Sequence, residues 1–208
     1  MIKIKNLSKK YGIKEIFKNL NLEIDQGDFI WIYGVSGAGK TTLLNILGML
    51  DEDYTGSIEI LGLKNPKIDG SGKALLKNDI SYLFQNYGLV EYESIYYNLN
   101  VINKVAKKKD KKEIMQQVLQ KVGLKHLKLK QAVYELSGGE QQRLAIAKIL
   151  LKQPKIIFCD ESTGSLDMQN AKVIMNLLKE LNNQGATIVI VSHDDLVANY
   201  VNKKLEIF

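Results

Sequence analysis

Cysteine, proline, histidine and long apolar stretches are all scarce in this sequence of 208 residues. The single cysteine, Cys159, cannot form an internal disulfide, which excludes a disulfide-stapled secreted scaffold and favours a reducing compartment. No apolar run approaches the roughly 18 residues that a membrane-spanning helix needs. The N-terminal stretch MIKIKNLSKK is too polar for a secretory signal. We therefore expect a soluble cytoplasmic protein, or the soluble part of a larger one.

The composition itself is that of an ordinary globular domain. Hydrophobic residues make up 45% of the chain and charged residues 25%, which excludes disordered and fibrous classes. Since domains average roughly 150 residues, the length predicts one domain. Lysine and arginine outnumber the acidic residues by 29 to 23, so the net charge is +6. An excess of this kind fits a nucleic acid, an anionic membrane surface or merely a lysine-rich proteome, and charge alone does not identify the partner.

Five lysines lie close together between residues 107 and 112. The segment that follows places Ile114, Val118 and Val122 at intervals of four residues, which predicts an amphipathic helix. We interpret the lysine run as the solvated start of this helix rather than as a dedicated anion-binding patch.

Two segments late in the chain, KIIFCDE (155–161) and ATIVIVSHD (186–194), are almost wholly apolar. Apolar runs of this length are typical of strands that are buried on both faces of a parallel sheet. The residues between them predict a helix that Gly185 ends. The expected apolar stripe of this helix is Val173, Ile174, Leu177, Leu178 and Leu181. Strand, helix and strand in this order predict a right-handed crossover in an α/β fold.

Shorter alternating segments before residue 85 predict further strands, whereas residues from about 86 to 135 lack buried-strand runs and are expected to be helical. We therefore expect one domain over 1–208, with a core formed by 1–85 and 136–208 and a helical subdomain over about 86–135.

A glycine-rich segment, Gly34-Val-Ser-Gly-Ala-Gly-Lys40-Thr41, follows the strand-like DFIWIY and precedes the helical TLLNILGML. It matches G-x-x-x-x-G-K-[ST] in the required context. Its glycines let backbone N–H groups turn towards phosphate oxygens, and the helix N-terminus adds positive charge. Lys40 supplies a cation for the β- and γ-phosphates, and the Thr41 hydroxyl is a hard oxygen ligand for Mg²⁺. The segment predicts nucleotide binding but does not say what the nucleotide is for.

Two carboxylates, Asp160 and Glu161, end the first buried strand at the edge where ligands bind in open α/β sheets. Adjacent strand residues point to opposite sides, so the two should serve different roles. We expect Asp160 to join the Mg²⁺ shell and Glu161 to orient and deprotonate a water attacking the γ-phosphorus. Cys159 is expected to be a small buried hydrophobe rather than a nucleophile.

The segment Leu136-Ser-Gly-Gly-Glu140-Gln-Gln-Arg143 opens a predicted helix with Ser137 as N-cap. A Ser-Gly-Gly helix start is a second anion-binding device. Followed by a strand that ends in Asp160 and Glu161, it makes the sequence resemble the ATP-binding cassette (ABC) family over essentially its full length. The resemblance implies an ATPase that binds and hydrolyses ATP together with Mg²⁺. It also implies a P-loop NTPase fold with a mostly parallel core sheet, an N-terminal antiparallel β subdomain and a helical subdomain.

The same resemblance assigns roles to single residues. Tyr11 would stack on adenine, Gln85 would join the core to the helical subdomain, and His193 would contact the γ-phosphate. Residues 165–167 would cross a dimer interface. The implied nucleotide-binding residues are Tyr11, Gly34, Val35, Ser36, Gly37, Ala38, Gly39, Lys40, Thr41, Thr42, Ser137, Gly138, Gly139, Glu140 and Asp167. The implied catalytic residues are Lys40, Gln85, Glu161 and His193, and the implied metal ligands are Thr41, Gln85 and Asp160.

Each of these roles has an alternative. Tyr11 could be one of ten tyrosines without a special role, and His193 could be a core histidine with its hydrogen bonds made. His126 has no matching family position and is expected to be structural or exposed. The chain also departs from the family pattern. Ser162 stands where the family usually has proline, which would leave the turn after Glu161 less rigid.

Within the family, TTLLNILGMLD and DESTGSLD look like the branch that serves macrolide efflux, lipoprotein release and bacteriocin or antimicrobial-peptide export. The resemblance implies an ATPase subunit that powers export of a peptide or other amphipathic substrate from the cytoplasmic face of the membrane. We expect an ATP-sandwiched dimer, with a homodimer favoured over a heterodimer, and no nucleic-acid partner. Because the chain ends at Phe208 without fused membrane helices, the permease is expected to be a separate chain.

Two other functions stay open at this point. One is a mechanical regulator that bends a membrane partner without moving cargo, as in cell-division cassettes. The other is a cassette that acts on ribosomes or DNA. Four tyrosines after Gln85 either anchor the permease or pack the helical subdomain: Tyr87, Tyr92, Tyr96 and Tyr97.

Overall fold

The computed structural model describes residues 1–84, 86–100, 111–161 and 167–207. Within these ranges the strands are β1 (Ile2–Tyr11), β2 (Lys14–Ile24), β3 (Phe29–Tyr33), β4 (Thr55–Ile60), β5 (Leu63–Lys64), β6 (Ile80–Leu83), β7 (Ile156–Asp160), β8 (Thr187–Val191) and β9 (Lys203–Glu206). The helices are α1 (Lys40–Leu47), α2 (Gly72–Asn78), α3 (Ile95–Asn100), α4 (Lys111–Lys121), α5 (Gly138–Lys152) and α6 (Met168–Asn183), with short 3₁₀ turns at Val133–Glu135 and Asp195–Asn199.

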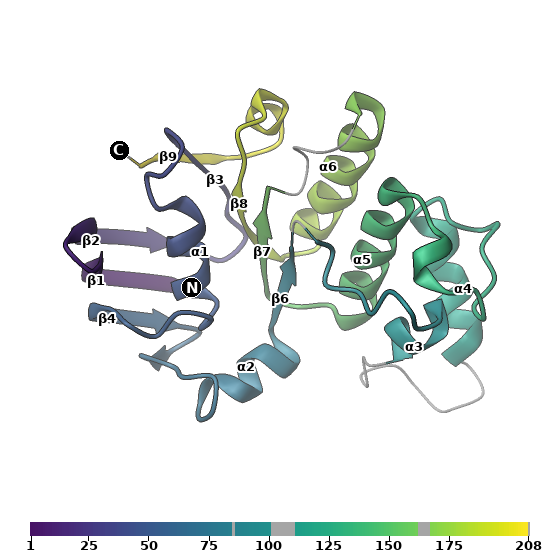
Figure 1. Ribbon diagram of the computed structural model, residues 1–208, viewed down its shortest axis with the longest axis horizontal. Coiled ribbons are helices and arrows are strands. Elements are labelled where there is room, and N and C mark those ends of the chain that lie inside the picture. Colours follow the sequence, from purple (N-terminus) through teal and green to yellow (C-terminus); the bar gives the residue numbers. More distant parts are fainter. Residues whose placement is uncertain (85, 101–110, 162–166, 208) are drawn as a thin grey trace.

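The strands form two sheets. One is antiparallel, with the order β2-β1-β4-β5, and the other is parallel, with the order β6-β7-β8-β3-β9. Helix α1 lies between the two sheets, and α5 and α6 cover the opposite face of the parallel sheet (Figure 1). The predicted fold, a parallel core sheet with an N-terminal antiparallel sheet, is confirmed.

The alternation of side chains along β3 and β7 divides the core into two clusters. Ile30 on β3 and Phe158 on β7 pack with α1 and the antiparallel sheet. Trp31 and Cys159, one residue further along, pack with α5 and α6 on the other side. Because neighbouring strand residues face opposite sides, both faces of the sheet are buried, which explains the continuous apolar runs in the sequence.

Helix α6 begins at its N-cap Asp167 and ends as predicted. The N–H of Gly185, which has φ of 100°, donates to the carbonyl oxygen of Asn182 at 2.9 Å. Ile174 and Leu178 are buried, but the expectation for Val173 is wrong, since this side chain is 38% exposed. Ala171 and Met175 are buried instead, so the stripe is centred further round the helix. The buried stripe is the part of the helix that packs against the sheet, and helical periodicity alone does not show where that contact lies.

Helix α4 shows a smaller shift of the same kind. Its buried residues are Met115 and Leu119, followed by Val122, whereas Ile114 and Val118 lie half-buried beside them. Residues 107–109 of the lysine run lie outside the described residues.

The described parts of 86–135 contain α3, α4 and a 3₁₀ turn, and their side chains pack on α5. The boundaries of a helical subdomain near residues 85 and 136 stay a prediction. Within the described ranges, no helix is both long and apolar enough to cross a bilayer.

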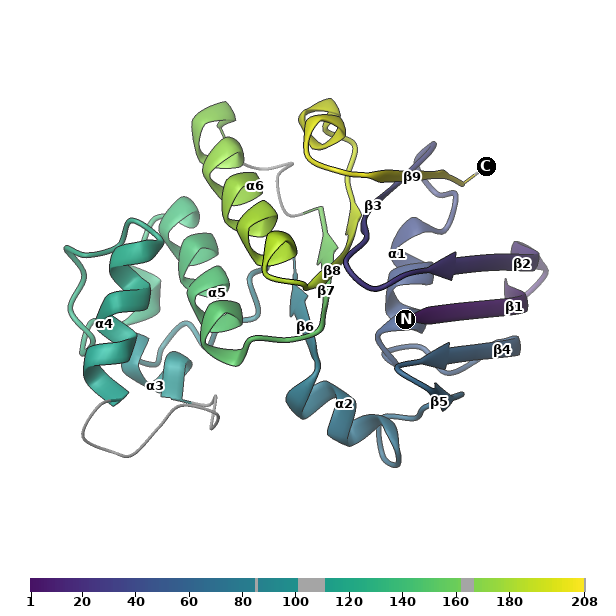
Figure 2. The same cartoon turned by 180° about the vertical axis from the view of Figure 1, so that it is seen from behind.

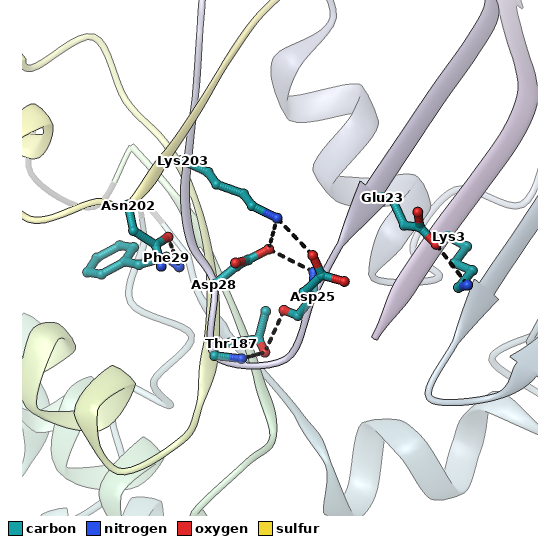
Figure 3. A network of polar contacts seen from close by, with 9 residues as sticks. Lys3, Glu23, Asp25, Asp28, Phe29, Thr187, Asn202 and Lys203 are labelled. Carbon is teal, nitrogen blue, oxygen red and sulfur yellow. Dashed lines mark hydrogen bonds and ion pairs between the residues drawn. The ribbon is translucent and has the colours of Figure 1, made fainter.

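A network of polar contacts lies at the edge of the parallel sheet where its strands begin (Figure 3). The ammonium of Lys203, at the start of β9, contacts Oδ2 of Asp25 at 3.0 Å and Oδ2 of Asp28 at 2.7 Å. The side chain of Asn202 accepts a hydrogen bond of 2.8 Å from the N–H of Phe29. These contacts fix β9 to the turn before β3, at the end of the sheet away from the phosphate loop.

Candidate functional site

The phosphate loop connects the end of β3 to the first residue of α1. Gly34 has φ of 142°, and a Cβ at this position would lie 2.0 Å from the carbonyl oxygen of Ile207. Gly39, the N-cap of α1, has φ of 95°, and its Cβ would lie 2.4 Å from Cγ2 of Ile16. Both positions therefore require glycine, for the backbone conformation and for the close approach of neighbouring chain.

Lys40 lies against the loop rather than in solvent. It is 5% exposed, and its ammonium donates to the carbonyl oxygens of Gly34 at 3.0 Å and Val35 at 2.9 Å. The N–H groups of the first helical turn have no acceptors within the helix, and they lie at the positive end of its dipole. The loop therefore gathers an ammonium and a helix N-terminus, which together suit an anion such as a phosphate group.

The hydroxyl of Thr41 donates to Oδ1 of Asp160 at 3.1 Å, which joins α1 to the end of β7. Burial raises the pKa of Asp160, and the charge of Glu161 raises it further, against the opposing effects of Thr41 and Lys40. A hydroxyl and a carboxylate in contact are hard oxygen donors of the kind that Mg²⁺ prefers. Among the described residues no cluster of three or more histidine, cysteine or acidic side chains suits a metal. Gln85, the third predicted ligand, lies outside the described residues.

Glu161 and His193 lie side by side at the ends of β7 and β8. Nε2 of His193 is 3.4 Å from Oε1 of Glu161. The N–H of Glu161 donates to the carbonyl oxygen of Val191 at 2.9 Å, and its φ of 44° is one that non-glycine residues rarely adopt. Two residues back, Cys159 is fully buried, and burial raises the pKa of its thiol. The prediction that Cys159 is a buried hydrophobe is confirmed.

The start of α5 carries the second predicted anion-binding device. Ser137 is the N-cap, as predicted, and it forms a capping box with Glu140. Oε2 of Glu140 accepts from the N–H of Ser137 at 2.9 Å and from its hydroxyl at 2.8 Å. Nε2 of His126 contacts the other carboxylate oxygen at 2.9 Å. The bonds from Ser137, then His126, lower the pKa of Glu140. His126 is 61% exposed, as expected, but its partner was not foreseen.

The two segments that are predicted to bind anions lie apart in the fold. The phosphate loop leads into α1 between the sheets, whereas α5 lies on the opposite face of the parallel sheet (Figure 2). In the described part of the chain, no hydrogen bond or ion pair joins residues 34–42 to residues 137–140.

Asp167 is linked to the start of α5 through Asn170. One carboxylate oxygen of Asp167 accepts from the N–H of Asn170 at 2.9 Å, and the other accepts from its amide at 2.6 Å. The amide oxygen of Asn170 accepts from Arg143 of α5 at 2.5 Å. A Cβ at Gly139 would lie 3.3 Å from the same amide. Asn170 was not predicted from the sequence, and Arg143 was predicted only as the end of the segment 136–143, without a partner. Ser165 and Leu166 lie outside the described residues.

Tyr11 ends β1 and is half-exposed. Its hydroxyl donates to Oδ2 of Asp51 at 2.8 Å, and the buried ammonium of Lys9 lies 4.6 Å from its ring centroid. No local sequence signal points to Lys9 or Asp51, because the contact spans 42 residues of chain.

Known proteins resemble this chain in sequence and structure. Residues 17–164 match the family model described as ABC transporter. The chain is 38% identical over 210 residues to the macrolide export ATP-binding/permease protein MacB of Campylobacter jejuni, which it matches over its own full length and 33% of MacB. It therefore spans about a third of that relative. It is 37% identical over 212 residues to the lipoprotein-releasing system ATP-binding protein LolD of Francisella tularensis, over 98% of this chain and 91% of LolD.

A solved structure extends the likeness to the fold. It is the dimeric, post-hydrolysis state of the ATP-binding cassette MJ0796 bound to ADP and Pi. It aligns with a TM-score of 0.87 and 34% identity, over 100% of this chain and 94% of that one. Family model, relatives and structure agree with the loop and the carboxylate pair: the chain belongs to the ABC transporter family and is an ATP-hydrolysing domain of that family.

Proposed function

We propose that the chain powers export through a membrane permease supplied by a separate chain, acting as an ATP-sandwiched dimer on the cytoplasmic face of the membrane. The observation that carries the ATP-driven part of this proposal is the contact of Thr41 with Asp160 beside the pair of Glu161 and His193, and the export part rests on the relatives that the chain resembles. MacB and LolD, which the chain resembles, are named for macrolide export and lipoprotein release. A peptide, bacteriocin or other amphipathic molecule is our proposed cargo.

The proposed mechanism assigns each group one task. Lys40 and the first turn of α1 bind the β- and γ-phosphates, and Tyr11 stacks on adenine. Thr41 and Asp160 hold Mg²⁺, which when bound neutralises charge on the phosphate oxygens. Glu161 accepts a proton from the attacking water, and His193, 3.4 Å from it, faces the γ-phosphate. Gln85 remains a proposed participant.

The dimer completes the site. The signature residues Ser137 to Glu140 lie on the opposite face of the sheet from the phosphate loop, so we propose that they bind ATP held by a partner cassette. The dimeric MJ0796 structure supports this arrangement. We propose that Asp167, which Asn170 links to the signature helix, lies at the same interface.

A patch of exposed aromatic and apolar side chains is our proposed contact with the permease. Tyr92 is 87% exposed and Tyr134 is 59% exposed, with their ring centroids 6.0 Å apart, and Val90 and Tyr97 are about half-exposed beside them in the sequence. Tyr96, by contrast, packs partly buried against the core. We therefore assign docking to the neighbouring rings of Tyr92 and Tyr134, with Val90 and Tyr97 as further exposed candidates in the same segment, and packing to Tyr87 and Tyr96.

A two-step experiment tests the function. The purified chain should release phosphate from Mg-ATP, and Lys40→Ala should lose nucleotide affinity while Lys18→Ala, an exposed lysine of β2, should not. The chain is then reconstituted in vesicles with the membrane protein that co-purifies from its host. ATP-dependent movement of a labelled peptide supports export, whereas ATP hydrolysis without any flux supports the mechanical regulator.

The docking patch has its own test in the same system. Tyr92→Ala with Tyr134→Ala should weaken permease co-purification and leave ATP binding intact. The matched control is Ile13→Ala, a fully exposed apolar residue in the turn between β1 and β2. Unchanged co-purification would contradict the assignment of this patch.

A further inference from the structure

Lys9 is a buried lysine whose donors are all engaged. It lies on β1 with 3% of its surface exposed. Its ammonium contacts Oδ1 of Asp51 at 2.9 Å, Oδ2 of Asp53 at 3.3 Å and the carbonyl oxygen of Asp53 at 2.5 Å. Three acceptors match the three donors of an ammonium, so the position of Nζ is closely defined.

Tyr11 is held by the same carboxylate. Residues 9 and 11 are two apart on one strand, so their side chains share a face of the sheet. The hydroxyl of Tyr11 donates to Oδ2 of Asp51 at 2.8 Å, while Oδ1 of Asp51 accepts from Lys9. The ammonium also lies over the Tyr11 ring, 4.6 Å from its centroid. The ring is therefore fixed at its hydroxyl and on one face, and half of its surface is exposed.

The network stays charged around neutral pH. Burial disfavours both ionised groups, but hydrogen bonds from Lys9 and Tyr11 outweigh it and lower the pKa of Asp51. Burial likewise opposes the charge of Lys9, and the bonds to Asp51 and Asp53 outweigh it and raise its pKa.

We propose that Lys9 and Asp51 are positioning residues for the nucleobase: they hold Tyr11 so that its face away from the ammonium is ready to stack on a purine. This inference rests on the proposed stacking of Tyr11. Its physical basis is preorganisation, because a ring that is already fixed loses little conformational freedom when the base binds. The contacts of Lys9 and Asp51 are with each other, Asp53 and Tyr11 rather than with the phosphate loop, so both residues should affect binding of the base and not of the triphosphate.

The test separates base binding from phosphate binding. The affinities of the whole chain for Mg-ATP and for inorganic tripolyphosphate are measured by calorimetry for four variants: Lys9→Met, Tyr11→Phe, Tyr11→Ala and Lys10→Met. Lys9→Met keeps the apolar stem and removes the charge. Tyr11→Phe keeps the ring and removes the bond to Asp51. Lys10→Met is the matched control, since Lys10 is exposed and pairs with Glu15 at 3.4 Å.

We expect Lys9→Met and Tyr11→Phe to weaken ATP binding roughly 2- to 10-fold, the range of ordering one side chain. Tripolyphosphate binding should stay unchanged in both. Lys10→Met should change neither affinity. Because Tyr11 is half-exposed, Tyr11→Phe is expected to fold even if Lys9→Met, which removes the ammonium that pairs with the partly buried Asp51, does not.

Two results would overturn the inference, and they are distinguishable from a failure of the proposed stacking. If Tyr11→Ala weakens ATP binding but Tyr11→Phe does not, the ring stacks without needing its anchor. If the variants weaken the binding of ATP and the binding of tripolyphosphate equally, the network stabilises the fold and does not position the ring for the base. If even Tyr11→Ala leaves ATP affinity unchanged, the stacking role itself is wrong.

Discussion

Thr41 donates a hydrogen bond of 3.1 Å to Oδ1 of Asp160, so the first turn of α1 and the last residue of β7 meet at one edge of the parallel sheet. The two side chains come from segments 119 residues apart in the sequence. Their contact brings a hydroxyl and a carboxylate together beside a buried lysine, Lys40. The carboxylate is partly buried, and this burial has a measurable consequence for the stability of the fold.

We predict that Asp160→Asn stabilises the nucleotide-free chain at pH 7 while it impairs ATP hydrolysis. A carboxyl group whose pKa is raised in the folded state binds protons more tightly there than in the unfolded state. Stability therefore rises as pH falls from 7 through the raised pKa towards the ordinary value of 3.8. Asparagine carries no charge, so the variant is more stable than the wild type at pH 7 and loses this extra stability in acid. We expect a rise in Tm of roughly 1–3 °C.

Thermal unfolding at pH 7 and at pH 4.5 checks this prediction. A Tm of Asp160→Asn at or below that of the wild type at pH 7 contradicts it, as does a gain that persists unchanged at pH 4.5. The matched control is Asp69→Asn, which removes a carboxylate that is exposed in the turn before α2.

A second prediction concerns the proposed base. Glu161→Gln should keep ATP affinity and lower the hydrolysis rate by roughly 100- to 10,000-fold, the usual contribution of a general base. The amide preserves shape and the contact distance to His193, but it cannot accept a proton. Glutamine adopts a positive φ no more readily than glutamate, so stability should not change. Phosphate release is measured beside Glu23→Gln, an exposed residue of β2; hydrolysis near the wild-type rate would remove Glu161 from this role.

A third prediction concerns Gly48, the C-cap of α1. A Cβ there would lie 1.5 Å from the hydroxyl oxygen of Tyr82, which donates to the carbonyl oxygen of Leu44 at 2.6 Å. Gly48→Ala should therefore displace Tyr82 and destabilise the fold by about 1–3 kcal/mol, the usual cost of overpacking. Gly70→Ala is the control, because no atom lies within 4 Å of its Cβ position and its φ is ordinary. Urea denaturation that gives equal stability for both variants would count against this reading of the packing.

Local patterns predicted what depends on local physics. The phosphate loop, the buried strands β7 and β8, the Ser137 cap and the end of α6 at Gly185 all follow from residues within a few positions of one another. Each is set by a backbone conformation or a period that the sequence displays directly.

Contacts across the fold could not be predicted in this way. The bond of Lys9 to Asp51 and that of Arg143 to Asn170 join separate parts of the chain. No sequence pattern near Lys9 or Arg143 indicates which residue is its partner. Val173 was placed on the buried stripe of α6 because helical periodicity defines a face but not its exact centre. The centre depends on how α6 packs against β8 and α5, which is a property of the assembled layers.

The last prediction concerns Gly139 and the proposed dimer. Its Cβ position lies 3.3 Å from three atoms of the Asn170 amide. This amide is held in place by its hydrogen bonds with Arg143 and Asp167. A side chain at Gly139 cannot easily push this amide aside, so its atoms beyond Cβ must turn away from Asn170. Gly139→Asp would also add a carboxylate beside Glu140, where an anion is expected to bind.

On a Glu161→Gln background, the chain should be monomeric without nucleotide and dimeric with Mg-ATP. Adding Gly139→Asp should abolish the dimer and leave ATP binding to the monomer unchanged, because the phosphate loop lies on the other face of the sheet. Gly139→Ala should weaken the dimer less, since it adds bulk without charge. Gly70→Asp, which adds the same charge at an open position, should dimerise like its parent. Size-exclusion chromatography with light scattering gives the masses; a dimer that forms without ATP, or that survives Gly139→Asp, would refute a site shared between two cassettes.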